Sequence, residues 1–201
     1  MQQYTLPLQK INNYHVDDFI FSMCNQSLKD LLDNRAVRWG YDPYPEIVLL
    51  TSPVDSGKTH FAHVARNLMS ELLILEDIDI GKDEEEILHS FNLCHENHQR
   101  ALFTCKEYEH FNLPDLKSRL ASVKVLHIDS PDDLMMRLLL MKSLTERSIK
   151  VSEDVVKFLL VRIPRSFVSI ARGVDLIDRL SIEQKRNISI HFLSSINFDS
   201  V

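Results

Sequence analysis

A short apolar run followed by a Gly-Lys-Thr turn constrains the fold of this chain more than any other feature. Residues 47–50 are typical of a buried parallel strand. They lead into the loop SPVDSGKT (52–59), which matches the phosphate-binding pattern GxxxxGK[ST] except that Ser52 stands at the first position. A helix is expected from about residue 58 to 67. Backbone N–H groups of such a loop and the N-terminus of the next helix can hold phosphate groups.

The loop predicts a nucleotide site for ADP or ATP with Mg²⁺. Lys58 would reach the outer phosphates and Thr59 would ligate Mg²⁺. The residues expected to contact the nucleotide are Asp55, Ser56, Gly57, Lys58, Thr59 and His60. Two features weaken the pattern: a left-handed conformation at Ser52 would cost about 1 kcal/mol, and Pro53 lacks an N–H donor. The alternative is a chance match, or a loop that no longer binds nucleotide.

A second apolar run, residues 72–75, ends in the carboxylates Glu76 and Asp77. In a Walker B arrangement one such carboxylate assists Mg²⁺ and the next polarises water. The expected Mg²⁺ residues are therefore Thr59, Glu76 and Asp77, although Glu76 is longer than the usual aspartate. The alternative is an acidic loop after a buried strand, with no role in binding.

Further apolar runs at 101–103 and 123–128 alternate with helical patterns, which indicates an α/β fold with a parallel sheet. One helix is expected over 16–32, with Asp17 as its cap, and another over 84–96; residues 39–45 are expected to form a loop. After Ser130 the periodicity is helical, over residues 132–146, 152–163, 166–180 and 190–196. This predicts a tail (1–12), an α/β base domain (13–129) and an all-helical domain (130–201).

Composition excludes several classes of protein. The 201 residues carry a formal net charge of −6, which disfavours a large non-specific nucleic-acid surface, so no direct nucleic-acid binding is expected. The three cysteines form no CxxC pair and are expected to be buried or neutral thiols. The sequence predicts neither a signal peptide nor a membrane span of 18 apolar residues. A cytoplasmic location is therefore expected.

Several segments, in the correct order, resemble the DnaA/Hda family of AAA+ proteins. The matching family patterns are YTFDNF…SN, LLIDDIQ…EEFFHTFN, the sensor 1 strand, LPDLxSRL and AITIDF. In this chain they are YHVDDF (14–19) with Asn25, LLILEDI (72–78) with EEILHSFN (85–92), LFT (102–104), LPDLKSRL (113–120) and NISIHF (187–192).

The resemblance implies a P-loop AAA+ base followed by a helical lid. It also implies strand order 5-1-4-3, because only about a dozen residues separate Thr59 from Leu72, too few for the family's strand 2 and its helix. Thr104 would be sensor 1. Sensor 2 departs from the family, since Ser169 stands where a phosphate-sensing arginine belongs, so weak or absent ATP hydrolysis by the chain itself is expected.

The resemblance further implies a role in controlling chromosomal replication initiation. Arg119 would be an arginine finger that acts in trans on ATP held by DnaA; the alternative is a surface arginine paired with Asp115 on its own helix. Like the family's QLSLPL peptide, the tail would dock on the sliding clamp (the beta subunit of DNA polymerase III), through Gln3, Leu6, Pro7 and Leu8.

The expected function is thus that of a regulatory inactivator of the Hda type, without the DNA-binding domain of DnaA. It would promote hydrolysis of DnaA-bound ATP while bound to the clamp. Two other functions stay open: an independent P-loop ATPase of loader type, and a scaffold that binds DnaA without nucleotide. A homo-oligomer is also compatible with the sequence.

Overall fold

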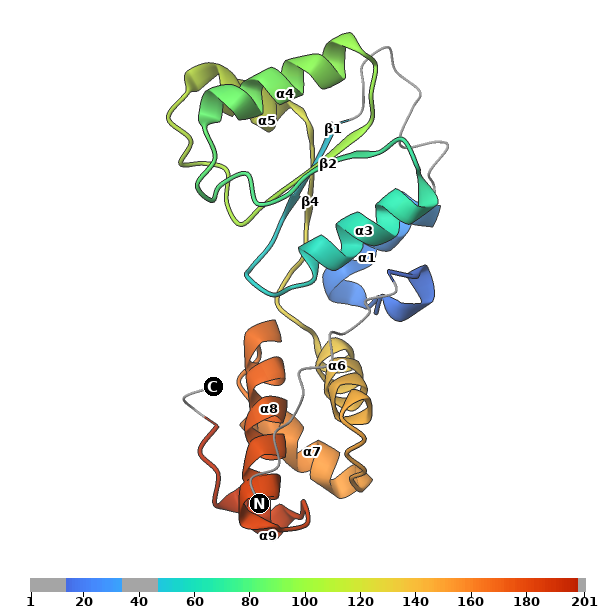
Figure 1. Cartoon of the computed structure of the whole chain (residues 1–201), viewed down its shortest axis with the longest axis vertical. Helices are drawn as coiled ribbons and strands as arrows, with labels where there is room; N and C mark the ends of the chain where they lie inside the picture. Colours follow the sequence, from blue (N-terminus) through green and yellow to red (C-terminus); the bar gives the residue numbers. More distant parts are fainter. Residues whose placement is uncertain (1–13, 34–46, 199–201) are drawn as a thin grey trace, which may run out of the picture.

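The computed structural model describes residues 14–33 and 47–198, which form an α/β part and a helical part stacked along the long axis (Figure 1). Among these residues, no helix is long and apolar enough to cross a lipid bilayer. The clamp-binding residues expected in the tail, and the loop expected at 39–45, lie outside the described residues.

The α/β part is built on a four-stranded parallel sheet. Its strands are β1 (Ile47–Thr51), β2 (Leu73–Leu75), β3 (Ala101–Cys105) and β4 (Lys124–His127), in the order β2-β3-β1-β4. The resemblance equates these strands with AAA+ strands 1, 3, 4 and 5, so the order is the expected 5-1-4-3 taken from the other edge. Residues 69–72, between α3 and β2, contain no strand. The expected P-loop α/β fold is therefore confirmed.

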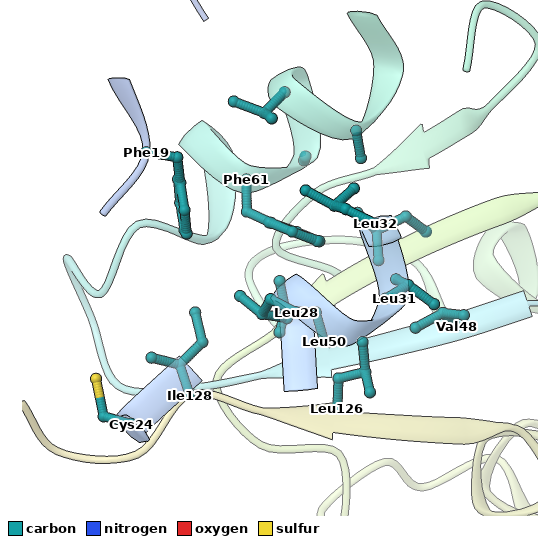
Figure 2. Packing of buried hydrophobic residues seen from close by; sticks show 14 of the residues in the cluster. Phe19, Cys24, Leu28, Leu31, Leu32, Val48, Leu50, Phe61, Leu126 and Ile128 are labelled. Atoms are coloured by element: carbon teal, nitrogen blue, oxygen red, sulfur yellow. The ribbon is translucent and has the colours of Figure 1, made fainter. Parts of the chain in front are cut away.

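Helices cover both faces of this sheet, because successive side chains of a buried strand point to opposite faces. Val48 and Leu50 pack on α1 (Gln26–Asp33) and α3 (Lys58–Leu68), as Figure 2 shows for Leu28, Leu31 and Phe61. The opposite face of the sheet packs on α4 (Glu84–Glu96) and α5 (Pro114–Ser122) through a separate apolar cluster. This layering leaves the carboxyl ends of the strands open at one edge, where the P-loop lies.

The helical part consists of α6 (Asp133–Glu146), α7 (Glu153–Arg162), α8 (Phe167–Gln184) and α9 (Ile190–Ser194), packed around a core of their own. Asp132 joins it to the α/β part: one carboxylate oxygen caps α6 by accepting from Met135 N (2.8 Å), and the other accepts from Cys24 N (3.1 Å). The expected all-helical lid is thus present.

The prediction of one helix over residues 16–32 is wrong for the first half of that range. The segment instead forms two 3-10 turns, η1 (Val16–Asp18) and η2 (Met23–Asn25), before α1 begins at Gln26. Phe19 is extended, and the Ser22 N–H donates to Asn25 Oδ1 (2.8 Å), so the helix starts anew there. The cap of η1 is His15 and not Asp17. Apolar periodicity alone does not reveal such a local restart.

A candidate nucleotide site at the P-loop

The P-loop connects β1 to the first turn of α3 and folds around the side chain of Lys58. The buried Lys58 ammonium donates to the carbonyl oxygens of Ser52 and Pro53, each at 3.2 Å. Gly57 has φ 94°, a left-handed conformation that glycine adopts without a Cβ penalty. No side chain caps α3 at Gly57. The free N–H groups of the first turn therefore remain available to an anion.

Ser52 does not adopt a left-handed conformation, so the cost of about 1 kcal/mol considered for this position does not arise. The positive-φ residues of the loop are Asp55 (φ 59°) and Gly57, and the Ser52 hydroxyl is instead hydrogen-bonded to the Ser56 hydroxyl. Both serines are buried. The serine at the first position of the motif is thus accommodated by a side-chain bond across the loop.

A pocket of about 420 Å³, here called the loop pocket, lies against the P-loop at the carboxyl edge of the sheet. Its polar lining comes from three segments: the P-loop, the chain after β2 and the chain after β3. The polar residues are Asp55, Lys58, Thr59, Asp77, Asp79 and Lys106. Two lysines and three aspartates in one pocket suit a phosphate group accompanied by a cation.

The expected Mg²⁺ residues are only partly brought together. Thr59 and Asp77 line the loop pocket, whereas Glu76 lies outside its lining and places Oε1 3.5 Å from His63 Nε2 on α3. Asp77 has φ 48°, and its N–H donates to the hydroxyl of Thr104 (3.0 Å). Asp79 and Lys106 are pocket residues that the motif search missed. Asp79 reaches the pocket through the turn that starts at Asp77, which no sequence pattern marked.

Thr104, the expected sensor 1 residue, is fully buried at the end of β3. Its hydroxyl accepts from Asp77 N and its carbonyl from Ile78 N (2.9 Å). In this conformation Thr104 therefore fixes the backbone of Asp77 and does not itself line the loop pocket.

A second pocket of about 190 Å³, here called the lid pocket, adjoins the first at Asp55 and Gly57. Its walls come from the segment before α1, from the start of α3 and from α6 and α8, with Phe19, His60, Leu139 and Ile170 among them. The Phe19 and His60 rings meet edge-to-face (5.3 Å between centroids). Burial, followed by the Lys142 ammonium, lowers the pKa of His60, so its ring is uncharged at neutral pH. An apolar slot with aromatic walls beside a phosphate-type pocket suits a nucleobase.

The sensor 2 position contributes nothing to either pocket. Ser169 is buried in the first turn of α8, where its N–H donates to the Ser166 hydroxyl (3.0 Å). Arg165, four positions before Ser169, pairs with Asp133 at the start of α6. A cation that reaches the lid pocket is Lys142, whose ammonium donates to the Asp18 carbonyl (2.6 Å) and ties α6 to the segment before α1.

Arg119 lies on α5, outside both pockets. Its guanidinium lies over the ring of Phe91 (5.7 Å to the centroid), and Nε is 3.7 Å from Asp115 Oδ2. Its side chain is 38% exposed, and Nε makes no hydrogen bond within the described residues. The geometry includes the i, i+4 pairing with Asp115 and leaves the guanidinium reachable from solvent.

Replacing Lys58 with alanine is expected to weaken binding of ADP or ATP by about thirtyfold or more, because removing one partner of a buried charge pair costs about 2–5 kcal/mol. Titration with a fluorescent adenine nucleotide measures the change. Lys82→Ala is the matched control, since Lys82 is exposed and, within the part of the chain that the structure describes, donates to the Glu76 carbonyl alone. Equal affinity of the Lys58 variant and the unmodified chain would contradict the assignment.

The cysteine thiols are expected to resist modification in the folded protein. All three are buried, and burial followed by the nearby Asp79 carboxylate raises the pKa of Cys105 to about 12. Since the thiolate is the reactive form, Cys105 stays neutral and unreactive at pH 8 and ionises only when unfolding exposes it. Ellman's reagent should release about three equivalents in denaturant and almost none without it. Fast labelling of the folded chain would contradict this burial.

The chain is similar to known proteins in sequence and in structure. Residues 132–196 match the family described as Hda, lid domain. A protein of Haemophilus influenzae, described as uncharacterized, is 28% identical over 153 residues, with 72% of this chain and 66% of that protein covered. This chain therefore spans slightly less than two thirds of that relative.

Solved structures agree on the fold. Domain III of the Thermotoga maritima replication initiation protein DnaA superposes with a TM-score of 0.72 at 14% identity, covering 90% of this chain and 93% of that one. The replication initiator DnaA bound to AMPPCP and single-stranded DNA gives 0.66 at 16% identity, covering 87% and 69%. The parallel sheet and the P-loop geometry are therefore those of the fold of DnaA domain III, and residues 132–196 of this chain are similar to the Hda lid domain.

Proposed function

We propose that this protein regulates chromosomal replication initiation by promoting hydrolysis of ATP bound to DnaA. The observation that carries the proposal is the position of Arg119, which lies outside the chain's own pockets and is open to solvent. An arginine placed in this way can act on a nucleotide held by another subunit, where its charge stabilises the transferring phosphoryl group. The Hda-type lid and the DnaA-type fold support DnaA as that subunit.

The chain's own site supports nucleotide binding more than turnover. The loop pocket and the lid pocket share Asp55 and Gly57. ADP or ATP would extend from one to the other, with Lys58 at the phosphates and His60 beside the base. Thr59 and the pocket carboxylates suit Mg²⁺, which prefers oxygen ligands and keeps several waters. Among the described residues, no arginine lines either pocket. We therefore assign the bound nucleotide a structural role.

The second partner is the sliding clamp, bound through the tail. Leu6 and Leu8 would fill an apolar pocket of the clamp while Gln3 hydrogen-bonds at its rim. Leu6→Ala should weaken clamp binding at least tenfold, since burying one leucine side chain stabilises by about 1.5–3 kcal/mol. Surface plasmon resonance on immobilised clamp measures this, with Thr5→Ala as the matched control. Equal binding by the two variants would remove Leu6 from the interface.

The test of the whole proposal is the rate at which ATP-loaded DnaA hydrolyses its nucleotide in the presence of DNA-loaded clamp, with and without this protein. Clear acceleration that Leu6→Ala and Arg119→Ala both abolish is the expected result. Acceleration that survives Lys58→Ala would assign the scaffold function, which the contacts of Lys58 with two loop carbonyls favour. A folded protein that gives no acceleration would refute the proposal.

A further inference from the structure

The chain after β2 carries three carboxylates, and they do not all face the same way. Asp77 and Asp79 line the loop pocket together with Thr59 and Lys58, whereas Glu76 does not. The two pocket aspartates are separated by Ile78, which is almost fully buried in the core between them. The turn that starts at the left-handed Asp77, closed by the Ile80 N–H donating to the Asp77 carbonyl (3.1 Å), thus brings Asp79 to the pocket.

The two carboxylate oxygens of Asp79 have different surroundings. Oδ2 accepts from the backbone N–H of Lys106 (2.9 Å) and Glu107 (3.4 Å), which fixes the side chain to the end of β3. Oδ1 is buried and has no hydrogen-bond partner in the part of the chain that the structure describes. A buried carboxylate oxygen without a donor or cation is unfavourable. A cation held in the loop pocket, which Asp79 lines, would offset this uncompensated negative charge.

Glu76, the residue at the usual metal position of the motif, has another partner. Its carboxylate lies 3.5 Å from His63, one helical turn beyond Thr59 on α3, and the two side chains are about equally half-buried. The ring of His63 is stacked on Tyr14 (4.3 Å between centroids), which holds the histidine beside Glu76.

We propose that Asp79, with Asp77, positions the Mg²⁺ of a bound Mg–nucleotide in place of Glu76. Asp79 and Asp77 would hold the hydrated Mg²⁺ through the charge of their carboxylates, with Thr59 and the nucleotide phosphates as its other oxygen partners. Mg²⁺ retains several waters when one or two carboxylates hold it, so an oxygen fixed by backbone donors suits this role. The inference rests on the nucleotide binding proposed above and names which carboxylate serves it.

The test compares nucleotide affinity with and without Mg²⁺. A fluorescent ATP analogue is titrated into the full chain in the presence of Mg²⁺ and, separately, of EDTA. The variants are Asp79→Asn, Glu76→Gln and, as a control outside the pocket, Asp115→Asn. Asparagine keeps the oxygen that accepts from Lys106 and Glu107 but loses the charge. In the presence of Mg²⁺, Asp79→Asn should bind the ATP analogue about tenfold more weakly. This is the lower end of the effect that outer-shell changes have on metal sites. Its affinity in EDTA should stay unchanged.

The EDTA arm also shows that the variant is folded. If Asp79→Asn does not fold, Asp79→Glu replaces it and should raise the Mg²⁺ concentration needed for half-maximal enhancement. Loss of the Mg²⁺ enhancement in Glu76→Gln, with Asp79→Asn unaffected, would overturn this inference while nucleotide binding stands. Absence of nucleotide binding in the unmodified chain would overturn both, whereas the action of Arg119 on DnaA is measured separately.

Discussion

Arg119→Ala should return ATP hydrolysis by DnaA to its unstimulated rate, a loss of up to about a thousandfold if Arg119 acts as an arginine finger. The reason is electrostatic, because the guanidinium would meet charge that develops on the transferring phosphoryl group in a site shielded from water. The measurement is single-turnover hydrolysis of radiolabelled ATP preloaded on DnaA, with DNA-loaded clamp and saturating variant protein.

Two variants separate a catalytic role of Arg119 from a structural one. Arg119→Lys keeps the charge but loses the planar fork, and it should recover only a small part of the activity. Asp115→Ala removes the neighbour 3.7 Å from Nε and leaves the guanidinium in place, so stimulation should persist. Full activity in Arg119→Ala, or equal losses in all three variants, would contradict the finger assignment.

The fold should tolerate the loss of Arg119. Its contact with the ring of Phe91 is of the kind that contributes about 0.5–1 kcal/mol at a site open to solvent. Helix α5 is held mainly by Leu116 and Leu120, which are both fully buried. Circular dichroism should therefore show an unchanged spectrum, which makes the kinetic result interpretable.

Phe103→Ala should lower the free energy of unfolding by about 3–5 kcal/mol, the usual cost of removing a buried aromatic ring. Phe103 is fully buried in β3, between β1 and β2, and its ring lies edge-to-face on Phe91 (6.2 Å between centroids). Since native domains are stable by only about 5–15 kcal/mol, this variant should lose a large fraction of its stability.

Urea denaturation followed by circular dichroism measures that change. Val125→Ala is the matched control, because Val125 lies on the edge strand β4 and is 38% exposed. Val125→Ala should lower the free energy of unfolding by well under half as much as Phe103→Ala does. A midpoint shift for Phe103→Ala no larger than the control's would show that the α4–α5 side of the sheet is not the tightly packed core described above.

The strands and the P-loop were predictable because their signals are local. A continuous apolar run marks β1, and the residues after it carry the loop motif, so the expected helix from 58 to 67 differs from α3 by one residue. The site was less predictable, because the direction of a side chain depends on partners distant in sequence. The orientation of Glu76 depends on His63, which stacks on Tyr14, and the role of the Thr104 hydroxyl depends on the turn at Asp77.

The lid pocket has walls from both parts of the molecule, and this has a thermodynamic consequence. A ligand that fills it contacts the P-loop on one side and α6 and α8 on the other, so it binds only when both are folded and correctly oriented. By mass action, nucleotide at a hundred times its dissociation constant would stabilise that joined state by about 2.7 kcal/mol. Bound nucleotide would then link the two parts reversibly, and its occupancy would set how firmly the lid keeps its angle to the base.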